Sequence, residues 1–327
     1  MLRYEPAVRP TLYFIGVSTG RSSIRKVFPA WAAYLNLDAV LCGIDVPLSA
    51  PRETYRRAVE FIRADRLSLG ALVTTHKIDL FEACEDLFDD LDPHAASLRE
   101  ISCISKRAGR LVCHAKDPIS VGLALDGFLP ADHFRRTGAD VFAIGAGGST
   151  IALGWHLMHR AGSRDRPARL IVSDCRSDRL AAIQRVHATL HPAAPLTYAL
   201  AQRPEDNDRL VGGLRAGSLI VNASGRGKDV PGSPLTSAAN FPAHSIAWDF
   251  NYRGDLLFLD QARVQPRDKQ IRTEDGWTYF IHGWLQVIAE VFQRSIPPSG
   301  AAFDELARIA LKTGRGAQPP APPLPTE

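Results

Sequence analysis

The sequence predicts an α/β protein, and three observations support this fold class. Short apolar runs of strand length alternate with segments of helical periodicity through most of the 327 residues. A glycine-rich turn, GAGGST at 145–150, separates one such run from the helix expected after it. The length also suffices for two domains of ordinary size. Strands that alternate with helices form parallel sheets whose faces the helices cover.

The first third of the chain contains three expected strand–helix units. Apolar runs at 12–15, 39–44 and 70–73 predict strands, and apolar residues at helical spacing predict helices over 24–35 and 55–62. Residues 101–105 and 111–113 flank KRAGR, a turn that contains a glycine, so this pair is expected to be antiparallel.

A second alternating block follows the hairpin. Its expected strands are 140–144, 169–173, 219–222 and 246–250, with a helix over 151–159 after the glycine turn. Later helices are expected over 279–292 and 301–311. The last residues, GRGAQPPAPPLPTE, are rich in proline and predict an unfolded tail over 314–327.

Composition excludes several classes of function. The net charge of +4 is small and spread along the chain, which does not favour nucleic-acid binding. No run of eighteen apolar residues predicts a membrane span, and MLRYEPAVRP lacks the apolar core of a secretory signal. The five cysteines form no CxxC or His/Cys cluster, so we expect reduced thiols, a cytoplasmic protein and no metal site.

The GAGGST turn predicts a site for a dinucleotide. Gly145 permits a tight turn, and Gly147 lets the backbone approach a pyrophosphate, whose charge the following helix N-terminus stabilises. Gly148 and Ser149 complete the expected contact surface, while Thr150 stands where the usual fingerprint has glycine or alanine. The alternative is a glycine-rich turn that binds no ligand.

An acidic residue ends the next expected strand. Asp174 is placed to accept hydrogen bonds from the adenosine ribose hydroxyls and to repel a 2′-phosphate, which favours NAD as cofactor. Arg176 and Arg179 follow closely enough to bind a phosphate instead, so NADP stays possible. Alternatively, Asp174 only caps the following turn.

Taken in order, these segments resemble the shikimate/quinate dehydrogenase family from about Leu12 to Phe292. The segments that carry the resemblance are IGVSTGRSS, LVTTHK, GRLVCHAKDPISVG, GAGGST, LIVNASGRG, WDFNY and EDG. The resemblance implies a substrate-binding domain formed by 1–125 with 276–313, and a Rossmann-type NAD(P)-binding domain over 126–275. It also implies the reversible NAD(P)-dependent oxidation of a secondary alcohol on a hydroxylated ring.

The resemblance assigns roles to individual residues. Lys77 matches the catalytic lysine and Asp117 its partner aspartate, a pair that can move the proton of an alcohol as hydride leaves its carbon. Other positions match segments that contact the substrate or the nicotinamide side of the cofactor. The implied substrate residues are Ser22, Thr74, Thr75, Ser102 and Tyr252, and Asn222 joins the cofactor residues.

Departures from the family pattern concentrate on the substrate. Ile24 replaces the second of two paired serines, Leu72 replaces an asparagine, and the segment before Lys77 is one residue shorter. The expected glutamine falls near His282 and Gly283. A polar site rejects analogues that leave its groups unpaired, so these changes predict a ring other than shikimate, either less polar or differently substituted.

Two other functions stay open at the level of sequence. One is a related enzyme on the same scaffold, such as a methylene-folate-type dehydrogenase or an NAD-assisted epimerase or lyase. The other is a non-catalytic regulator that binds a nucleotide. In each case we expect a small-molecule ligand and a monomer or homodimer, without nucleic acid, membrane or metal as a partner.

Overall fold

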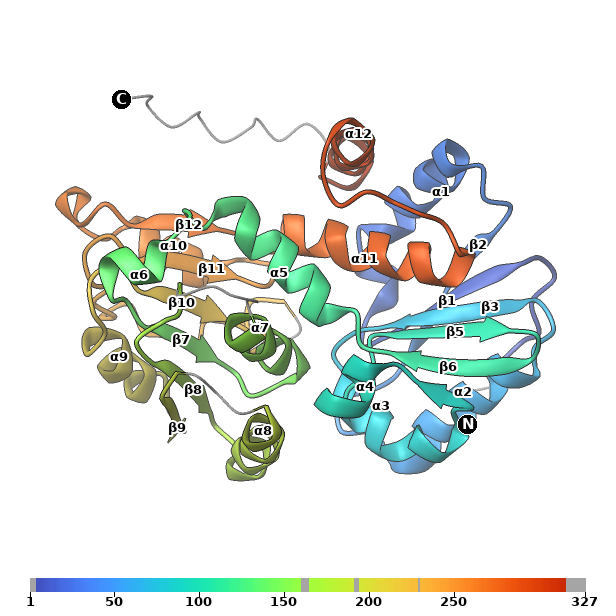
Figure 1. Cartoon of the computed structure of the whole chain (residues 1–327), viewed down its shortest axis with the longest axis horizontal. Helices are drawn as coiled ribbons and strands as arrows, with labels where there is room; N and C mark the ends of the chain where they lie inside the picture. The colour runs from blue at the N-terminus through green and yellow to red at the C-terminus, as the bar shows by residue number, and fades with distance from the viewer. Residues whose placement is uncertain (1–3, 160–164, 191–193, 229, 316–327) are drawn as a thin grey trace.

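A computed structural model describes residues 4–159, 165–190, 194–228 and 230–315 (Figure 1). Its strands form two six-stranded sheets that lie side by side, with helices between and around them. The mostly parallel strands and interleaved helices confirm the α/β fold class. Each sheet is a separate core layer, and the helices α5 and α11 lie where the two halves meet.

The first sheet has the strand order β2-β1-β3-β5-β6-β4. The expected hairpin is present as the antiparallel pair β5–β6, and β1 pairs in parallel with both β2 and β3. The strands are β1 (Thr11–Gly16), β2 (Val40–Asp45), β3 (Ser68–Val73), β4 (Asp90–Leu91), β5 (Cys103–Arg107) and β6 (Arg110–His114).

Apolar side chains alternate between the two faces of this sheet and bury both. Leu12 and Phe14 of β1 pack with one helical layer, whereas Tyr13 and Ile15 pack with the other. The first layer consists of α1 (Ile24–Leu35), α11 (Trp277–Phe292) and α12 (Ala301–Ala310). The second consists of α2 (Arg52–Ala64), α3 (Lys77–Cys84) and α4 (Pro93–Leu98).

The second sheet is wholly parallel, in the order β12-β11-β10-β7-β8-β9. The strands are β7 (Val141–Ile144), β8 (Leu170–Asp174), β9 (Leu196–Leu200), β10 (Leu219–Asn222), β11 (Ile246–Asp249) and β12 (Arg272–Glu274). One face is covered by α5 (Asp117–Phe128), α6 (His133–Thr137), α7 (Gly148–His159) and α8 (Ser177–Thr189). The other is covered by α9 (Pro204–Gly212) and α10 (Leu257–Arg263).

Three edge strands have no counterpart among the strands expected from sequence. β4 has two residues, β12 is the polar triplet RTE, and β9 is half exposed, so none has the buried apolar run that marks the central strands. The expected start of the tail at 314 needs correction, because a helical turn continues from Leu311 to Arg315. The rest of the expected tail, 316–327, lies outside the described residues.

Two kinds of feature are absent from the described residues. No helix in them is long and apolar enough to cross a membrane. They contain no cluster of three or more His, Cys, Asp or Glu side chains that is arranged to hold a metal ion. The carboxyl ends of parallel strands meet at one edge of each sheet, and both edges contribute to a single cleft, described next.

Candidate active site

A cleft of about 470 Å³ lies between the carboxyl ends of the two sheets. From the first sheet it is lined by the turn after β3, and from the second by the glycine turn after β7 and by Asp174 at the end of β8. Helix α11 supplies a third wall that includes Tyr279, Gly283 and Trp284. Such a crevice at the ends of parallel strands is where open α/β sheets bind ligands.

Lys77 and Asp117 meet at the floor of this cleft. They are 40 positions apart in sequence, and the Nζ atom of Lys77 forms an ion pair with the Oδ2 atom of Asp117. Their side chains are only 11% and 9% exposed, respectively. Lys77 begins α3 and Asp117 begins α5, so both backbone positions are fixed by a helix start. A cation at a helix N-terminus opposes the helix dipole, and the Asp117 carboxylate offsets that cost.

Two further hydroxyl groups complete the polar cluster. The hydroxyl of Tyr279 donates to Asp117 Oδ2 at 2.7 Å, and Lys77 Nζ lies 3.2 Å from the Ser149 Oγ atom. Tyr279 and Ser149 are 3.4 Å apart through their oxygens. Burial first, and then the charge of Asp117, raise the pKa of Tyr279 well above its ordinary value. The phenol therefore stays protonated and acts as a hydrogen-bond donor.

The turn that delivers Lys77 has an unusual backbone. Thr75 has φ = 61°, a left-handed conformation that a β-branched residue rarely adopts. His76 is buried and fixes the turn, because its Nε2 lies 2.9 Å from the Val46 carbonyl and its Nδ1 lies 3.2 Å from the Tyr55 hydroxyl. Strained backbone in a turn that lines a cleft is typical of functional sites. Thr74 and Thr75 both line the cleft.

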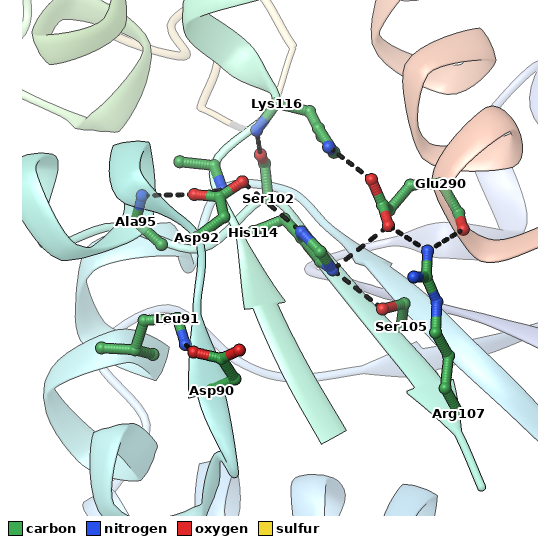
Figure 2. A network of polar contacts seen from close by, with 11 residues as sticks. Asp90, Leu91, Asp92, Ala95, Ser102, Ser105, Arg107, His114, Lys116 and Glu290 are labelled. Atoms are coloured by element: carbon green, nitrogen blue, oxygen red, sulfur yellow. Dashed lines mark hydrogen bonds and ion pairs between the residues drawn. The ribbon is translucent and has the colours of Figure 1, made fainter. Parts of the chain in front are cut away.

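A network of polar side chains holds Lys116, the residue that precedes Asp117, in place (Figure 2). The backbone N–H of Lys116 donates to Ser102 Oγ at 2.6 Å, and the Lys116 ammonium pairs with Glu290 of α11 at 2.7 Å. Glu290 also forms an ion pair with Arg107, and its carboxylate lies 3.7 Å from His114 Nε2. Burial opposes the ionisation of Glu290, but Lys116, His114 and Arg107 outweigh it and lower its pKa.

The glycine turn has the shape that close approach to a ligand requires. Gly145 has φ = 110°, and a Cβ there would lie 2.7 Å from the Ala223 carbonyl oxygen, so only glycine fits. A Cβ on Gly147 would meet nothing within 4 Å, which leaves open space beside that backbone. Thr150 is buried and donates to the Gly145 carbonyl at 2.5 Å, so this departure from the fingerprint closes the turn.

Asp174 lines the cleft next to the glycine turn. Its carboxylate accepts from the Ala146 N–H at 2.8 Å and from the Arg176 N–H at 2.9 Å. Asp174 therefore holds both the glycine turn and the turn that follows its own strand. Arg176 pairs with Asp178 at 2.5 Å. Arg179 pairs with Asp79 of α3 at 2.7 Å, across the mouth of the cleft.

The opposite end of the cleft combines few hydroxyls with a large apolar wall. The Ser22 and Tyr252 hydroxyls are 3.1 Å apart, and Ser102 lines the cleft although its oxygen already accepts from Lys116. The wall consists of Phe14, Leu72, Phe280, Trp284 and Val287. Leu72 thus occupies the cleft as expected from sequence, whereas Ile24 packs in the core and is not among the lining residues.

Asn222 and Ser23 are both absent from the cleft lining and have other partners. Asn222, expected among the cofactor residues, does not line the cleft; its buried amide donates to Asp249 at 3.1 Å and to the Arg226 carbonyl at 3.2 Å. It thereby holds the loop after β10. Ser23 does not point to the substrate either, since its hydroxyl donates to the Gly314 carbonyl at 3.2 Å.

Sequence reasoning missed two neighbours of the Lys77–Asp117 pair. Tyr279 comes from α11, 162 positions after Asp117, and no spacing rule connects the two. Glu100 is fully buried beside Lys77 and Gly148, in a segment that looked like an ordinary connection. The position expected to carry a glutamine is occupied by Gly283, which lines the cleft without a side chain, while His282 is buried and stacks on Phe303.

No family model matches the sequence. The shikimate dehydrogenase (NADP+) of Symbiobacterium thermophilum is 28% identical over 277 residues, which cover 83% of this chain and 85% of that protein. The shikimate dehydrogenase (NADP+) of Streptococcus gordonii is 28% identical over 221 residues, which cover 65% of this chain and 70% of that protein.

Solved structures share the whole fold. Shikimate dehydrogenase from Aquifex aeolicus superposes with a TM-score of 0.69 at 17% identity, covering 93% of this chain and all of that one. The quinate dehydrogenase of Corynebacterium glutamicum in complex with NAD gives 0.67 at 17% identity, covering 93% and 99%. The Thermus thermophilus shikimate dehydrogenase in complex with NADP(H) and shikimate gives 0.64 at 22% identity, covering 92% and 99%. The chain is therefore shikimate dehydrogenase-like in sequence and fold.

Proposed function

We propose that this chain catalyses the reversible, NAD(P)-dependent oxidation of a secondary alcohol on a hydroxylated ring. The observation that carries the proposal is the buried Lys77–Asp117 pair at the floor of a cleft whose neighbouring wall is a glycine turn. Two relatives named as shikimate dehydrogenases align with 83% and 65% of this chain, each at 28% identity. The pairing of a proton-transfer site with a dinucleotide turn is what alcohol oxidation needs.

Lys77 is the proposed acid and base. In alcohol oxidation its neutral amine accepts the hydroxyl proton as hydride leaves the carbon, and in reduction its ammonium returns that proton to the developing alkoxide. Asp117 fixes the Nζ atom through the ion pair, and Tyr279 fixes Asp117 in turn. Ser149, 3.2 Å from Lys77 Nζ, extends this cluster to the edge of the glycine turn.

The glycine turn and Asp174 fit a nicotinamide dinucleotide, which when bound supplies the hydride acceptor or donor. We propose that the backbone of Gly145, Gly147 and Gly148 lies along the pyrophosphate, because the space beside Gly147 is open. NAD is the preferred cofactor in this proposal. Asp174 is an anion at the ribose position, and both nearby arginines are already paired with carboxylates.

The two sheets correspond to two proposed domains. Residues 1–125 with 276–313 form the substrate-binding domain, since α11 and α12 pack on the first sheet. Residues 126–275 form the Rossmann-type domain around the second sheet. The chemistry then takes place between the domains, where each contributes one wall.

The substrate is proposed to be a less polar ring alcohol than shikimate. The cleft end opposite the glycine turn pairs Ser22 and Tyr252 with an apolar wall that includes Leu72 and Trp284. A ring with hydroxyls on every carbon would leave some of them unpaired against this wall, which costs about 1–3 kcal/mol for each buried group. A ring with one apolar face fits it better.

A substrate screen tests the proposal. The purified protein is mixed with NAD+ or NADP+ and with shikimate, quinate, aminated analogues or inositols, and the reduced cofactor is followed by its absorbance. We expect turnover with NAD+ of a ring alcohol other than shikimate, with one NADH formed for each product. Brisk turnover of shikimate would contradict the substrate proposal alone. Cofactor binding without any turnover would favour a regulator, and product without NADH would favour an epimerase or lyase.

A further inference from the structure

Glu100 is a buried carboxyl group next to the acid–base pair, and the mechanism proposed above does not use it. It lies between α4 and β5, and its exposed surface is 0%. Neither of its carboxyl oxygens has a hydrogen-bond partner among the residues that the structure describes. Buried carboxyl groups normally have partners, so one that lacks them at the edge of a reactive site calls for a functional explanation.

The carboxyl group of Glu100 lies where three elements meet. A Cβ built on Gly148 would be 2.4 Å from Glu100 Oε2, and 3.3 Å from both Cβ and Cδ of Lys77. The backbone of the same segment is tied to the lysine, because the Ile101 N–H donates to the Lys77 carbonyl at 3.2 Å. Glu100 thus contacts the first residue of α7 and lies beside the aliphatic stem of Lys77.

The two carboxylates near Glu100 oppose its ionisation, whereas the Lys77 ammonium favours it. Asp117 at the start of α5 and Asp92 at the start of α4 are carboxylates, and the Lys77 ammonium on α3 is already paired with Asp117. The charge of an ionised Glu100 would also raise the pKa of Tyr279 on α11 and of Cys113 on β6. Burial first, then Asp117, raise the pKa of Glu100 well above its ordinary value.

We propose that Glu100 is a third ionisable member of the Lys77–Asp117 group and controls how readily Lys77 gives up its proton. The inference rests on the proposed function, and Glu100 acts through Lys77 as a positioning residue, since it is not among the residues that line the cleft. With Lys77 as ammonium and Asp117 as carboxylate, a neutral Glu100 leaves the buried group without net charge.

The direction of the effect follows from the signs of the charges. When Glu100 ionises at higher pH, a second carboxylate faces Lys77 and favours its ammonium form. Fewer molecules then carry the neutral amine that accepts the alcohol proton. Glu100→Gln keeps the shape and the neutral state at every pH, so Lys77 loses its proton at lower pH in this variant.

The first test measures kcat/KM for alcohol oxidation against pH. In Glu100→Gln we expect the midpoint of the rise to move to lower pH by about half a unit or more. Glu100→Asp keeps the ionisable group and is expected to restore a midpoint closer to that of the wild type. The matched control is Glu82→Gln, the same change on the exposed face of α3. Superimposable profiles for wild type, Glu100→Gln and Glu82→Gln would overturn the proposal.

The second test needs no activity. When folding raises the pKa of a carboxyl group, the folded protein becomes less stable as pH rises above the pKa of the unfolded state. A glutamine at the same position has no such effect. The Tm of Glu100→Gln relative to wild type is therefore expected to rise between about pH 4 and pH 8. A constant difference would overturn the buried-acid assignment. If this difference rises but the wild type oxidises no ring alcohol, the proposed function fails while the buried acid stands.

Discussion

At the scale of single residues, one oxygen atom organises the site. Asp117 Oδ2 pairs with Lys77 from α3 and accepts from Tyr279 of α11 at 2.7 Å, and Ser149 of α7 lies 3.5 Å away. Charge-assisted hydrogen bonds of this kind are stronger than neutral ones and set the orientation of the acceptor. The position of the Lys77 amine therefore depends on side chains from three other helices.

Removing the hydroxyl group of Tyr279 is expected to slow catalysis while the protein still folds. Tyr279→Phe deletes one donor to a carboxylate, worth about 1.5–3 kcal/mol, so kcat should fall roughly 10- to 100-fold. The KM for the alcohol should change less, because Tyr279 acts on Asp117. Steady-state kinetics measure both values. Tyr198→Phe is the control, since that hydroxyl bonds His187 in the second half of the chain. Equal kcat in Tyr279→Phe and wild type would show that Asp117 needs no such support.

A methyl group at position 148 is expected to disturb the Lys77–Asp117 pair through Glu100 and the Lys77 side chain. Gly148→Ala places a carbon 2.4 Å from Glu100 Oε2 and 3.3 Å from the Lys77 stem, so both side chains must move. We expect a Tm several degrees lower and kcat at least about tenfold lower, as overpacking costs roughly 1–3 kcal/mol. Gly127→Ala on α5 meets nothing within 4 Å and should leave activity intact. A fully active, equally stable Gly148→Ala variant would contradict the described packing.

The sequence predicted a pairing of Lys77 with Asp117 but not the surroundings of that pair. Lys77 and Asp117 stand in segments whose order matches a known family, and the structure brings them together. Tyr279 and Glu100 could not be found in this way, because each acts through a tertiary contact that no local pattern encodes. Asn222 shows the opposite case: its segment matched, but its amide is used inside the loop.

At the scale of elements, the network around Glu290 fastens α11 to the β5–β6 hairpin (Figure 2). Arg107 comes from β5, Lys116 follows β6, and Glu290 lies near the end of α11. The Lys116 side chain is only 14% exposed and belongs to this network. The network thereby restrains the residue next to Asp117.

Glu290→Gln is expected to destabilise the protein at neutral pH but not at low pH. The pKa of Glu290 is lowered in the folded state, so its stabilisation is present above the unfolded pKa, about 4.3, and is lost as pH falls through the folded pKa. We expect a loss of about 1–2 kcal/mol at pH 7 from urea unfolding. Glu305→Gln, at an exposed helical pair, should change little. A difference that persists undiminished below pH 3 would argue against the ion pairs as its cause.

Central elements were easier to predict than edge elements. β1, β3, β7 and β10 are buried and apolar, so hydrophobic runs reveal them. β4, β9 and β12 are outermost strands of their sheets, where partial exposure permits polar residues. Their pairing depends on neighbours far away in sequence, which a local pattern does not contain.

At the scale of the whole molecule, an ion pair joins the two halves at the mouth of the cleft. Arg179 of α8 reaches Asp79 of α3 at 2.7 Å, and both residues line the cleft near Asp174. Because the charge of Asp79 neutralises Arg179, this guanidinium is a weaker site for a 2′-phosphate than its position suggests. The pair therefore favours NAD in the proposed function.

Asp79→Asn is expected to shift the cofactor preference. Removing the carboxylate leaves Arg179 to pair with a phosphate, so the ratio of kcat/KM for NADP+ to that for NAD+ should rise about tenfold. The control is Asp86→Asn, whose partner Arg56 lies on α2. Initial rates with both cofactors at several concentrations give the ratio. An unchanged ratio would show that Arg179 does not face the 2′ position.

The general plan of the molecule was predictable from its alternating pattern, since βαβ order leaves few possible topologies. The way the two halves meet was not predictable, because it depends on the packing of α5 against α11, two helices that are far apart in the sequence. That packing creates the cleft and brings Lys77, Asp117 and Tyr279 to one point.

The most direct test of the account is the activity of Lys77→Met on the ring alcohol that the wild type oxidises. Methionine keeps the length of the side chain and removes the amine, so general acid–base catalysis worth about 10²–10⁴-fold should be lost from kcat. NADH binding should stay close to that of Lys26→Met, a change at an exposed lysine of α1, whereas Tm should be lower, because Asp117 is left buried without its ion-pair partner. A folded Lys77→Met enzyme that retains a kcat within about threefold of wild type would contradict the central claim.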